Sequence, residues 1–349
     1  MESTGNPRIT RRLAVAIVSL LMVVGSIVPG VAVAQDDACE WPSETLQLMA
    51  PAAAGGGWDT TARELQRVLD EEGIVEGDVE VYNVEGAGGT IGLAELVSEH
   101  VGNENVLMVM GLVMIGGIGL NQSPVTLDQV TPIAQLTGEY EVIVVPADSP
   151  YQTLDDLIVD FEADPTAISW GGGSAGGTDH LLIALMAQQL GIDPAMVNYV
   201  AFSGGGEALA SVMGGQTTAG VSGLGEWAAQ IESGELRALA ISGRAEAADG
   251  ATPVAEGDLG ASIPTLQDQG IDLELANWRG IVAPPEVSPE STACIIAAFD
   301  ELNASAGWQA TLDQYGWSNL YLAGDEFDAY LDEQIATINE TLTELGLIS

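Results

Sequence analysis

Basic side chains are almost absent from this 349-residue sequence. It contains no lysine, and eight arginines stand against 51 aspartates and glutamates, which gives a formal net charge of −43 at pH 7. A chain with this charge repels polyanions, so we exclude nucleic acid and anionic phospholipid head groups as partners. Without a lysine, phosphate-loop nucleotide sites and Schiff-base chemistry are excluded as well.

Histidine and cysteine are equally scarce. The histidines are His100 and His180, and the cysteines are Cys39 and Cys294. Two histidines without a cluster of acids beside them do not make a catalytic zinc site, and the cysteine spacing does not suggest a metal. We therefore expect no metal and no cofactor.

The first residues have the pattern of a secretory leader. Three arginines precede an apolar run over residues 13–28, Pro29-Gly30 breaks the run, and Ala32-Val33-Ala34 is the small-x-small pattern that signal peptidase accepts. We expect a signal peptide over residues 1–34, with an uncleaved membrane anchor as the alternative. Since no later run has about 18 apolar residues, we expect an exported protein at the periplasmic or extracellular face of the cell envelope.

Removal of the leader leaves 315 residues, enough for two domains or one large one. The leader contains three arginines and one acid, so five arginines and 50 acids remain, a formal charge of −45. The acids are scattered over the whole length, as in salt-adapted proteins, and melting temperatures with and without molar salt would test that hypothesis. In an exported protein Cys39 and Cys294 can form one disulfide, and two buried thiols are the alternative.

Short apolar runs alternate with amphipathic segments, which is typical of an α/β fold. We expect an irregular surface loop over residues 245–260. The pattern predicts strands over 46–50, 79–84, 106–110, 140–146, 167–170, 198–201, 218–221 and 237–242. It predicts helices over 59–71, 91–99, 153–161, 178–190, 206–213, 227–233, 289–304, 308–314 and 325–345.

Four of the predicted strands lead into a glycine cluster that opens a predicted helix. The clusters lie at residues 55–57, 86–89, 171–177 and 204–206. Glycine lets backbone N–H groups point into one space, and the start of a helix adds unpaired N–H groups and the positive end of its dipole. Several such turns around one cleft would bind an anion without a basic side chain. The alternative is that glycine merely fills tight strand-to-helix turns.

Two enzyme patterns occur in the same residues. Gly172-Gly-Ser174-Ala-Gly176 fits the nucleophile elbow of serine hydrolases. However, His100 precedes the serine, and His180 leaves the same turn on the following helix, so neither is placed to complete a triad. Gly171-x-Gly173-x-x-Gly176 matches a dinucleotide fingerprint, which is weak on its own. We therefore expect a protein without catalytic activity.

Six segments in order resemble the extracytoplasmic solute receptors of tripartite tricarboxylate transporters. They are APAAAGGGWDTTAR (50–63), NVEGAGGTIG (83–92), TPIAQLTGEYEVIVVPADSPYQTLDDL (131–157), GGSAGGTDH (172–180), ELRALAISG (235–243) and WRGIVAPPEVSPE (278–290). The resemblance implies a type II periplasmic-binding-protein fold, in which two α/β lobes joined by a hinge have a ligand cleft between them. It places the first lobe at 35–141 and 239–349 and the second at 142–238.

The resemblance also implies the ligand and the residues that hold it. Receptors of this family bind carboxylates largely through main-chain amides, waters and hydroxyl groups, and deliver them to a membrane permease of one large and one small subunit. In the first lobe the expected ligand-binding residues are Ala54, Gly55, Gly56, Gly57, Trp58, Asp59, Gly88, Gly89, Thr90 and Gly111. In the second lobe they are Ser174, Gly176, Gly177, Thr178, Ser203, Gly204, Ser222 and Gly223.

Several side chains have a structural interpretation beside the functional one. Asp59 is expected to pair with Arg63 one helical turn later, more than to face a ligand. Trp58 either lines the site or packs between loop and core. We expect His180 to be a buried packing or hydrogen-bonding residue, and Arg279 to brace the hinge more than to reach the cleft.

The function predicted from the sequence is an exported, monomeric receptor that binds a small, citrate-like di- or tricarboxylate and delivers it to the two-subunit permease. One alternative is an exported serine hydrolase that uses Ser174. The other is a receptor for a different small acid, such as an amino acid or an aromatic acid.

Overall fold

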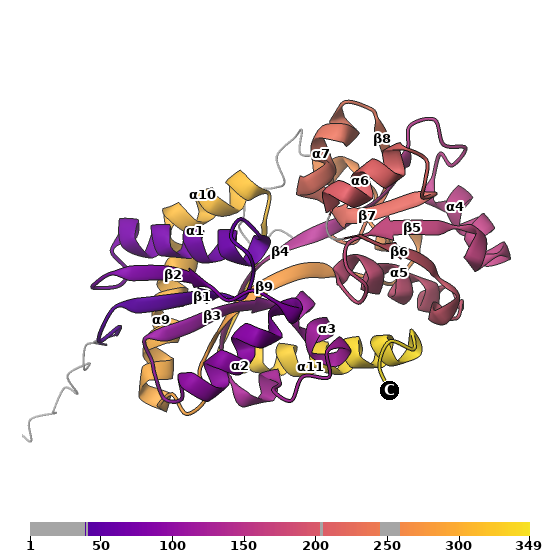
Figure 1. Ribbon diagram of the computed structural model, residues 1–349. Coiled ribbons are helices and arrows are strands. Elements are labelled where there is room, and N and C mark those ends of the chain that lie inside the picture. The colour runs from indigo at the N-terminus through magenta and orange to yellow at the C-terminus, as the bar shows by residue number, and fades with distance from the viewer. Residues whose placement is uncertain (1–38, 40, 203–204, 245–258) are drawn as a thin grey trace, which may run out of the picture. The chain divides into compact units, whose positions relative to one another are not determined.

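The alternating apolar runs fold into one mixed sheet with helices against both of its faces (Figure 1). In this computed structural model the described residues are 39, 41–202, 205–244 and 259–349. Within them, Cys39–Ser349 belong to one compact unit. The ten strands are β1 (Leu46–Ala50), β2 (Val79–Asn83), β3 (Val106–Gly111), β4 (Thr131–Pro146), β5 (Ser169–Gly172), β6 (Asn198–Ala201), β7 (Ala219–Gly223), β8 (Leu236–Ile241), β9 (Ala276–Ala283) and β10 (Ser318–Ala323).

The long strand β4 is shared by two groups of strands. Its first part, residues 131–140, pairs antiparallel with β9 and β10. Its last part, residues 141–146, pairs antiparallel with β7 and β8. The order β2-β1-β3-β9-β4-β7-β5-β6 therefore runs from a first α/β lobe into a second through one continuous strand. Figure 1 shows β4 and β9 crossing between the two groups of elements.

The first lobe is a sheet between two layers of helices. On one face, α1 (Gly57–Glu72), α9 (Pro289–Ala304) and α10 (Ala306–Tyr315) share a core with the strands. On the other face lie α2 (Thr90–Glu99), α3 (Leu112–Leu120) and α11 (Asp325–Glu344). After Trp58, apolar residues of α1 recur along one face and are buried, as an amphipathic helix requires: Ala62, Leu65, Val68 and Leu69.

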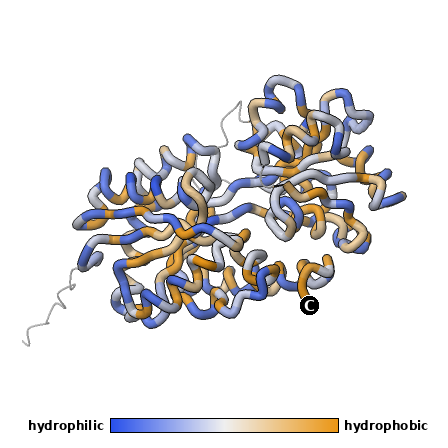
Figure 2. The backbone as a smooth tube through the Cα atoms, viewed as in Figure 1, coloured by the Kyte–Doolittle hydropathy of each residue, from blue (hydrophilic) through white to orange (hydrophobic). Residues whose placement is uncertain are grey.

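The second lobe is built in the same way around β7, β5 and β6. Helices α4 (Leu154–Ala163) and α5 (Thr178–Gln189) pack against one face. Helices α6 (Gly205–Met213) and α7 (Leu224–Glu232) pack against the other, with the short α8 (Leu259–Ser262) beside α7. In Figure 2 the outer helices alternate between hydrophobic and hydrophilic residues, as helices with one buried face do.

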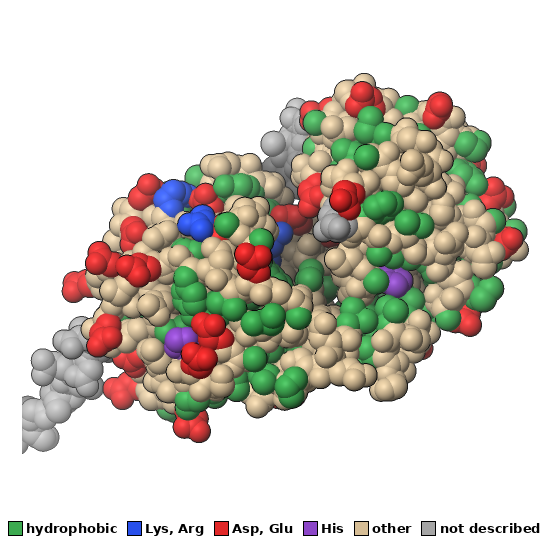
Figure 3. Space-filling model, viewed as in Figure 1, with side chains coloured by type: hydrophobic (Ala, Val, Ile, Leu, Met, Phe, Trp, Pro, Cys, Tyr) green, Lys and Arg blue, Asp and Glu red, His purple; other side chains and the backbone are tan. Residues whose placement is uncertain are grey.

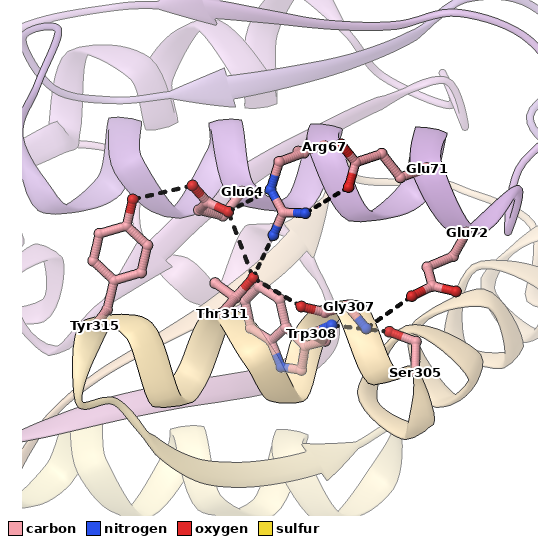
Figure 4. A network of polar contacts seen from close by, with 9 residues as sticks. All are labelled: Glu64, Arg67, Glu71, Glu72, Ser305, Gly307, Trp308, Thr311 and Tyr315. Atoms are coloured by element: carbon pink, nitrogen blue, oxygen red, sulfur yellow. Dashed lines mark hydrogen bonds and ion pairs between the residues drawn. The ribbon is translucent and has the colours of Figure 1, made fainter.

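A polar network joins α1 to α10 on the outer side of the first lobe (Figure 4). Arg67 bonds to Glu64 at 2.8 Å, to Glu71 at 2.7 Å and to the Thr311 hydroxyl at 2.7 Å. Tyr315 donates to Glu64 at 3.0 Å, so Glu64 connects the two helices a second time. This arginine is therefore committed to helix packing, away from the glycine turns.

One disulfide joins the start of the described chain to α9. Cys39 and Cys294 are bonded, with their Cα atoms 5.6 Å apart and 255 positions apart in sequence. This confirms the disulfide interpretation of the two cysteines. A cross-link over so long a loop restricts the unfolded chain strongly and can contribute on the order of 4–5 kcal/mol to the free energy of unfolding.

Most predicted elements are confirmed with boundaries shifted by a few residues, and β1, β6 and α9 match to the residue. Four helices and strands were missed: α3, α8, β9 and β10, together with the first part of β4. Helix α8 begins at residue 259, within the last two residues of the predicted loop. Helix α3 is apolar almost all round, so it lacks the helical period that reveals an amphipathic helix.

Two predictions fall on residues that the structure does not describe: the leader over 1–34 and most of the loop over 245–260. Among the residues that it does describe, no helix has both the length and the apolar character to cross a membrane.

Candidate functional site

The first glycine turn joins β1 to α1. Gly55 has a φ of 86°, and its N–H donates to the Asp59 carboxylate at 2.7 Å. Gly57 lies directly against Arg279, because a Cβ atom added there would be 2.9 Å from Nη2 of the guanidinium. Ala54, Gly55 and Gly57 are exposed. The turn therefore presents its backbone outward with an arginine beside it.

The second glycine turn lies beside the first and leads into α2. A Cβ atom added to Gly89 would be 2.8 Å from the ring of Trp58, so this indole packs on the glycine. The Thr90 hydroxyl donates to the Ala87 carbonyl at 2.9 Å and caps its own turn. Gly88 packs against Gly117 of α3, where an added Cβ would be 3.1 Å from the Cα atom. Trp58 thus links the two turns, half-buried between them.

Gly111 ends β3 against the backbone of β9. It is buried, pairs in register with Arg279, and has no room for a Cβ beside the Trp278 carbonyl. Its role in the structure is the close approach of two strands. Arg279, its register partner, points toward Gly57, so Gly111 is adjacent to the first turn through the strand pairing.

The third glycine turn joins β5 to α5 in the second lobe. The Gly173 N–H donates to the Asp179 carboxylate at 2.6 Å, and the Gly176 N–H donates to Nδ1 of His180 at 3.0 Å. Tyr199 stacks on His180 with ring centroids 4.2 Å apart and donates to the Gly173 carbonyl at 3.0 Å. Side chains of the same lobe therefore hold this turn in place.

The residues of the third turn differ in accessibility. Ser174 is exposed, Gly177 is half-buried, and Gly176 and Thr178 are buried. The Thr178 hydroxyl has no hydrogen-bond partner among the described residues.

The fourth turn lies at the start of α6, opposite the end of β7. Ser203 and Gly204, both predicted ligand-binding residues, lie outside the described residues. The Ser222 hydroxyl donates to Glu226 at 3.3 Å, and the Glu226 carboxylate covers the position where a Cβ of Gly205 would be. A carboxylate of the protein therefore already lies at the start of this helix.

Two contacts connect the turns of the two lobes. Glu139 lies between Gly223 of β7 and Arg279. A Cβ atom added to Gly223 would be 3.0 Å from Oε2 of Glu139, and Arg279 donates to Oε1 at 3.0 Å. Since Arg279 in turn lies against Gly57, a continuous path leads from the second lobe to the first turn. The second contact is between Gly116 of α3 and the third turn, because a Cβ atom added to Gly116 would be 2.5 Å from the Gly176 carbonyl oxygen.

The surface between the two groups of elements is hollowed in the space-filling view (Figure 3). Acidic side chains are spread over this face and basic ones are few. Each of the five arginines that the structure describes has a partner in the chain: Arg63, Arg67, Arg237, Arg244 and Arg279. The hollow therefore offers a ligand no unpaired cation among the described residues.

Carboxyl groups near the turns have opposite electrostatic environments. Hydrogen bonds from Arg63 hold the pKa of Asp59 at about 2. Burial raises the pKa of Asp179 to about 6. The hydrogen bond from the Gly173 N–H lowers this pKa in part, and the negative charge of Glu226 raises it. Partial desolvation raises the pKa of Glu226, although this residue is exposed at the surface, and burial raises the pKa of Glu141 well above its usual value.

Sequence reasoning missed these acids as part of the site. Glu139, Glu141, Asp179 and Glu226 gather around the turns of the second lobe, although they come from three different elements. The available signal was the pair of acids in Gly138-Glu-Tyr-Glu141, which stands in an otherwise apolar strand. Acids in such a strand either lie at its exposed end or line a site.

The structural interpretations of single side chains agree with the geometry. Arg63 bonds to Asp59 at 2.9 Å through both Nε and Nη2. Arg279 pairs with Glu139 and lies over the Trp317 ring, 5.1 Å from its centroid. Burial lowers the pKa of His180 to about 4, so this imidazole is neutral and accepts the Gly176 N–H.

The same contacts argue against the serine hydrolase interpretation. Nδ1 of His180 accepts the Gly176 N–H, so the neutral ring carries its proton on Nε2 and has no free nitrogen to accept a proton from Ser174. No group of histidine, cysteine and acidic side chains within the described ranges could hold a metal ion.

A separate cavity of about 460 Å³ lies between β4, β10 and α11. Its lining includes Tyr140, Glu274 and Tyr330 and contains none of the predicted ligand-binding residues. The Tyr140 hydroxyl donates to Glu274 at 3.0 Å across it.

Comparisons with known proteins agree with this architecture. The profile of the family described as "Tripartite tricarboxylate transporter family receptor" matches residues 62–347. The fold is similar to that of a TctC solute binding protein from Polaromonas, with a TM-score of 0.72 and 24% identity, covering 87% of this chain and 100% of that one.

Two further solved structures are similar. MatC from Rhodopseudomonas palustris with bound malate has a TM-score of 0.64 and 20% identity, over 86% of this chain and 99% of that one. A second R. palustris protein, with adipate, has a TM-score of 0.67 and 19% identity, over 88% of this chain and 98% of that one. The predicted fold class is thereby confirmed. The matched family and the similar structure are solute-binding receptors, which agrees with the prediction of a protein without catalytic activity.

Proposed function

This chain belongs to the tripartite tricarboxylate transporter receptor family, and from that premise we propose that it captures a small di- or tricarboxylate outside the cytoplasm and delivers it to a membrane permease. We propose a citrate-like acid as the ligand. The permease would be the two-subunit partner implied by the sequence, and the receptor would act as a monomer after removal of residues 1–34.

One observation carries the proposal: glycine turns of both lobes lie along a single path of contacts. Gly57 touches Arg279, Arg279 pairs with Glu139, and Glu139 lies against Gly223. Turns on opposite faces of the molecule would not be joined through one pair of side chains. The first N–H groups of α1 have no acceptor within the helix, so they supply donors for a carboxylate on this path.

The solved relatives support a carboxylate as the ligand. One carries malate and another carries adipate, and both molecules are dicarboxylates. Among the described residues no unpaired cation lies near the turns, which agrees with binding through main-chain amides. We therefore propose that the ligand-binding residues are those expected from the sequence, with Thr90 and Gly111 in supporting positions.

We also propose that the two halves of the sheet act as lobes that close on the ligand. The boundaries predicted from the sequence are 35–141 with 239–349 for the first lobe and 142–238 for the second. We propose that β8 and α8, which pack with the last part of β4 and with α7, belong with the second lobe. Strands β4 and β9 would form the hinge, since β4 belongs to both halves and β9 pairs with it over residues 276–283.

Thermal shift of the mature protein against a panel of carboxylates tests this function. A ligand that binds only the folded state raises the melting temperature. At a ligand concentration 100 times Kd it adds about 2.7 kcal/mol to the free energy of unfolding. We expect at least one di- or tricarboxylate to do so.

Gly56→Asp should abolish that shift. Gly56 precedes α1 with φ −76° and ψ 169°, a conformation that Asp adopts readily, and an added Cβ is 3.3 Å from the Ala53 carbonyl. Asp is a favourable residue at this position, and its negative charge at the start of α1 would repel a ligand carboxylate. Gly56→Asn is the matched control, because it caps the helix without the charge.

Loss of the shift in the Asp variant and its retention in the Asn variant would support the proposal. Equal shifts in all three proteins would contradict a site at this turn. Hydrolysis of a chromogenic ester that is lost in Ser174→Ala would favour the alternative function.

A further inference from the structure

Four acids form a wall on the second-lobe side of the proposed site. We call Glu139, Glu141, Asp179 and Glu226 the acidic wall. Glu141 is 1% exposed, and its charge interacts with each of the other three. Glu139 and Asp179 are partly accessible, and Glu226 is exposed. The wall therefore has a buried rear member and an accessible front.

The buried member of the wall lacks a donor. Neither side-chain oxygen of Glu141 receives a hydrogen bond from a backbone or side-chain N–H or hydroxyl group of the described residues. A proton shared with the neighbouring carboxyl of Asp179 is what remains to satisfy both groups. A pair that shares one proton keeps one negative charge without a cation beside it, and a positively charged donor from outside the protein would balance that charge.

The charges of the wall are not balanced by the protein. Arg279 neutralises Glu139 at 3.0 Å. Glu141, Asp179 and Glu226 remain, and if the first two share one proton, two negative charges are left. A plain dicarboxylate in this site would add two more charges of the same sign, which is unfavourable in a partly buried environment.

The wall also occupies the anion-binding groups of the second lobe. Asp179 holds the Gly173 N–H, and Glu226 lies over Gly205 at the start of α6. In the first lobe the corresponding carboxylate, Asp59, is neutralised by Arg63. A ligand carboxylate is therefore favoured at the first lobe and disfavoured at the second.

We propose that the ligand of this receptor is a dicarboxylate that carries a protonated amine, with its carboxylates toward the first-lobe turns and its ammonium group toward Asp179 and Glu226. This rests on the proposed receptor function and replaces its citrate-like ligand with an amino dicarboxylate, because it assigns the second half of the same site to an amine. An ammonium group supplies three donors for the accessible oxygens of Asp179 and Glu226, and its positive charge offsets the negative charge that the wall retains. A hydroxyl group supplies one donor and no charge.

Two series of acids that differ in one substituent test the proposal. The first is succinate, malate and aspartate, and the second is glutarate, 2-hydroxyglutarate and glutamate. Isothermal titration of the mature protein at pH 8 would give Kd for each. We expect the amino acid to bind at least about tenfold more tightly than the hydroxy acid of its series, the effect of one charge-assisted bond. The unsubstituted acid should bind most weakly.

Variants of the wall should remove this preference. Glu226→Gln and Asp179→Asn each keep the side-chain shape, and we expect Kd for the amino acid to rise about tenfold while Kd for the unsubstituted acid stays the same or falls. Glu232→Gln, on the exposed end of the same helix α7, is the matched control and should change neither.

The outcomes separate this inference from the proposed function. If the unsubstituted acid binds as tightly as the amino acid, the acidic wall does not recognise an amine, and the receptor function stands. If the hydroxy acid binds most tightly, the site prefers a neutral hydroxyl donor to an ammonium group, and the proposal is overturned. If every acid of both series and of the citrate panel fails to bind, both proposals fall.

Discussion

Asp59 and Asp179 occupy the same kind of position in the two lobes and have opposite charge states. Each lies in the first turn of a helix that follows a glycine turn, and each accepts a backbone N–H of that turn, at 2.7 Å and 2.6 Å. Four residues on, the first has Arg63 and the second has the apolar Ile183. The pKa of Asp59 is about 2, whereas that of Asp179 is about 6.

The comparison shows that the motif alone does not decide the electrostatics of a glycine turn. A cation one helical turn away keeps the first carboxylate ionised and satisfied. Without it, burial and the neighbouring Glu226 drive the second toward its protonated form. As a result one lobe faces the hollow with a neutralised turn and the other faces it with acids.

Removal of the cation should have the largest effect. In Arg63→Ala, Asp59, whose side chain is 3% exposed, loses its cation. We expect the free energy of unfolding to fall by about 2 kcal/mol at pH 7, less than for a fully buried pair because Arg63 is half exposed. Urea denaturation would measure it.

The lowered pKa also sets the pH dependence of that effect. The stabilisation by Asp59 is present above about pH 4 and is lost as pH falls through about 2. The difference between Arg63→Ala and the unchanged protein should therefore shrink below pH 4. Arg63→Lys should recover part of the stability, and an Arg63→Ala variant as stable as the original at pH 7 would show that the pair is dispensable.

Asp179→Asn tests the second carboxyl group of the pair and should have the opposite effect on the free energy of unfolding. A raised pKa means that the folded state favours the protonated acid, so this contribution to stability is present below about pH 4 and is lost as pH rises through about 6. We expect the variant to be more stable than the original protein by roughly 1–2 kcal/mol at pH 8.

At pH 4 the two proteins should be equal, because Asn resembles protonated Asp. Melting curves across pH would show the crossover, with Glu162→Gln, an exposed site on α4, as the control. A constant difference at every pH would mean that titration of Asp179 is not responsible.

The smallest effect concerns the side chains that hold the third glycine turn. Tyr199→Phe removes the hydroxyl that donates to the Gly173 carbonyl at 3.0 Å, and we expect a loss of about 1 kcal/mol. Tyr151→Phe, whose exposed hydroxyl bonds to Asp160, should change the free energy of unfolding very little. If the two variants lose the same amount, the Tyr199 bond has no special role in holding the turn.

Local patterns predicted a large part of the fold and some of the site. The apolar period of α1, the short β-prone run of β6 and the i, i+4 pair of Asp59 and Arg63 depend on residues close in sequence, and all three are present. β9 was missed although it is a buried central strand, because its apolar run is interrupted by Arg279 and Gly280. The partner that makes an arginine acceptable there, Glu139, is 140 positions away.

What the sequence by itself determined is the set of glycine turns, the scarcity of cations and the position of each candidate residue at the start of a helix, since these follow from short-range conformational preferences. Only the tertiary structure decided that Glu141 of β4, Asp179 of α5 and Glu226 of α7 meet in one place. Their meeting depends on strand order and on how α5 and α7 pack, and electrostatic interactions fall with distance in space and not with distance along the chain.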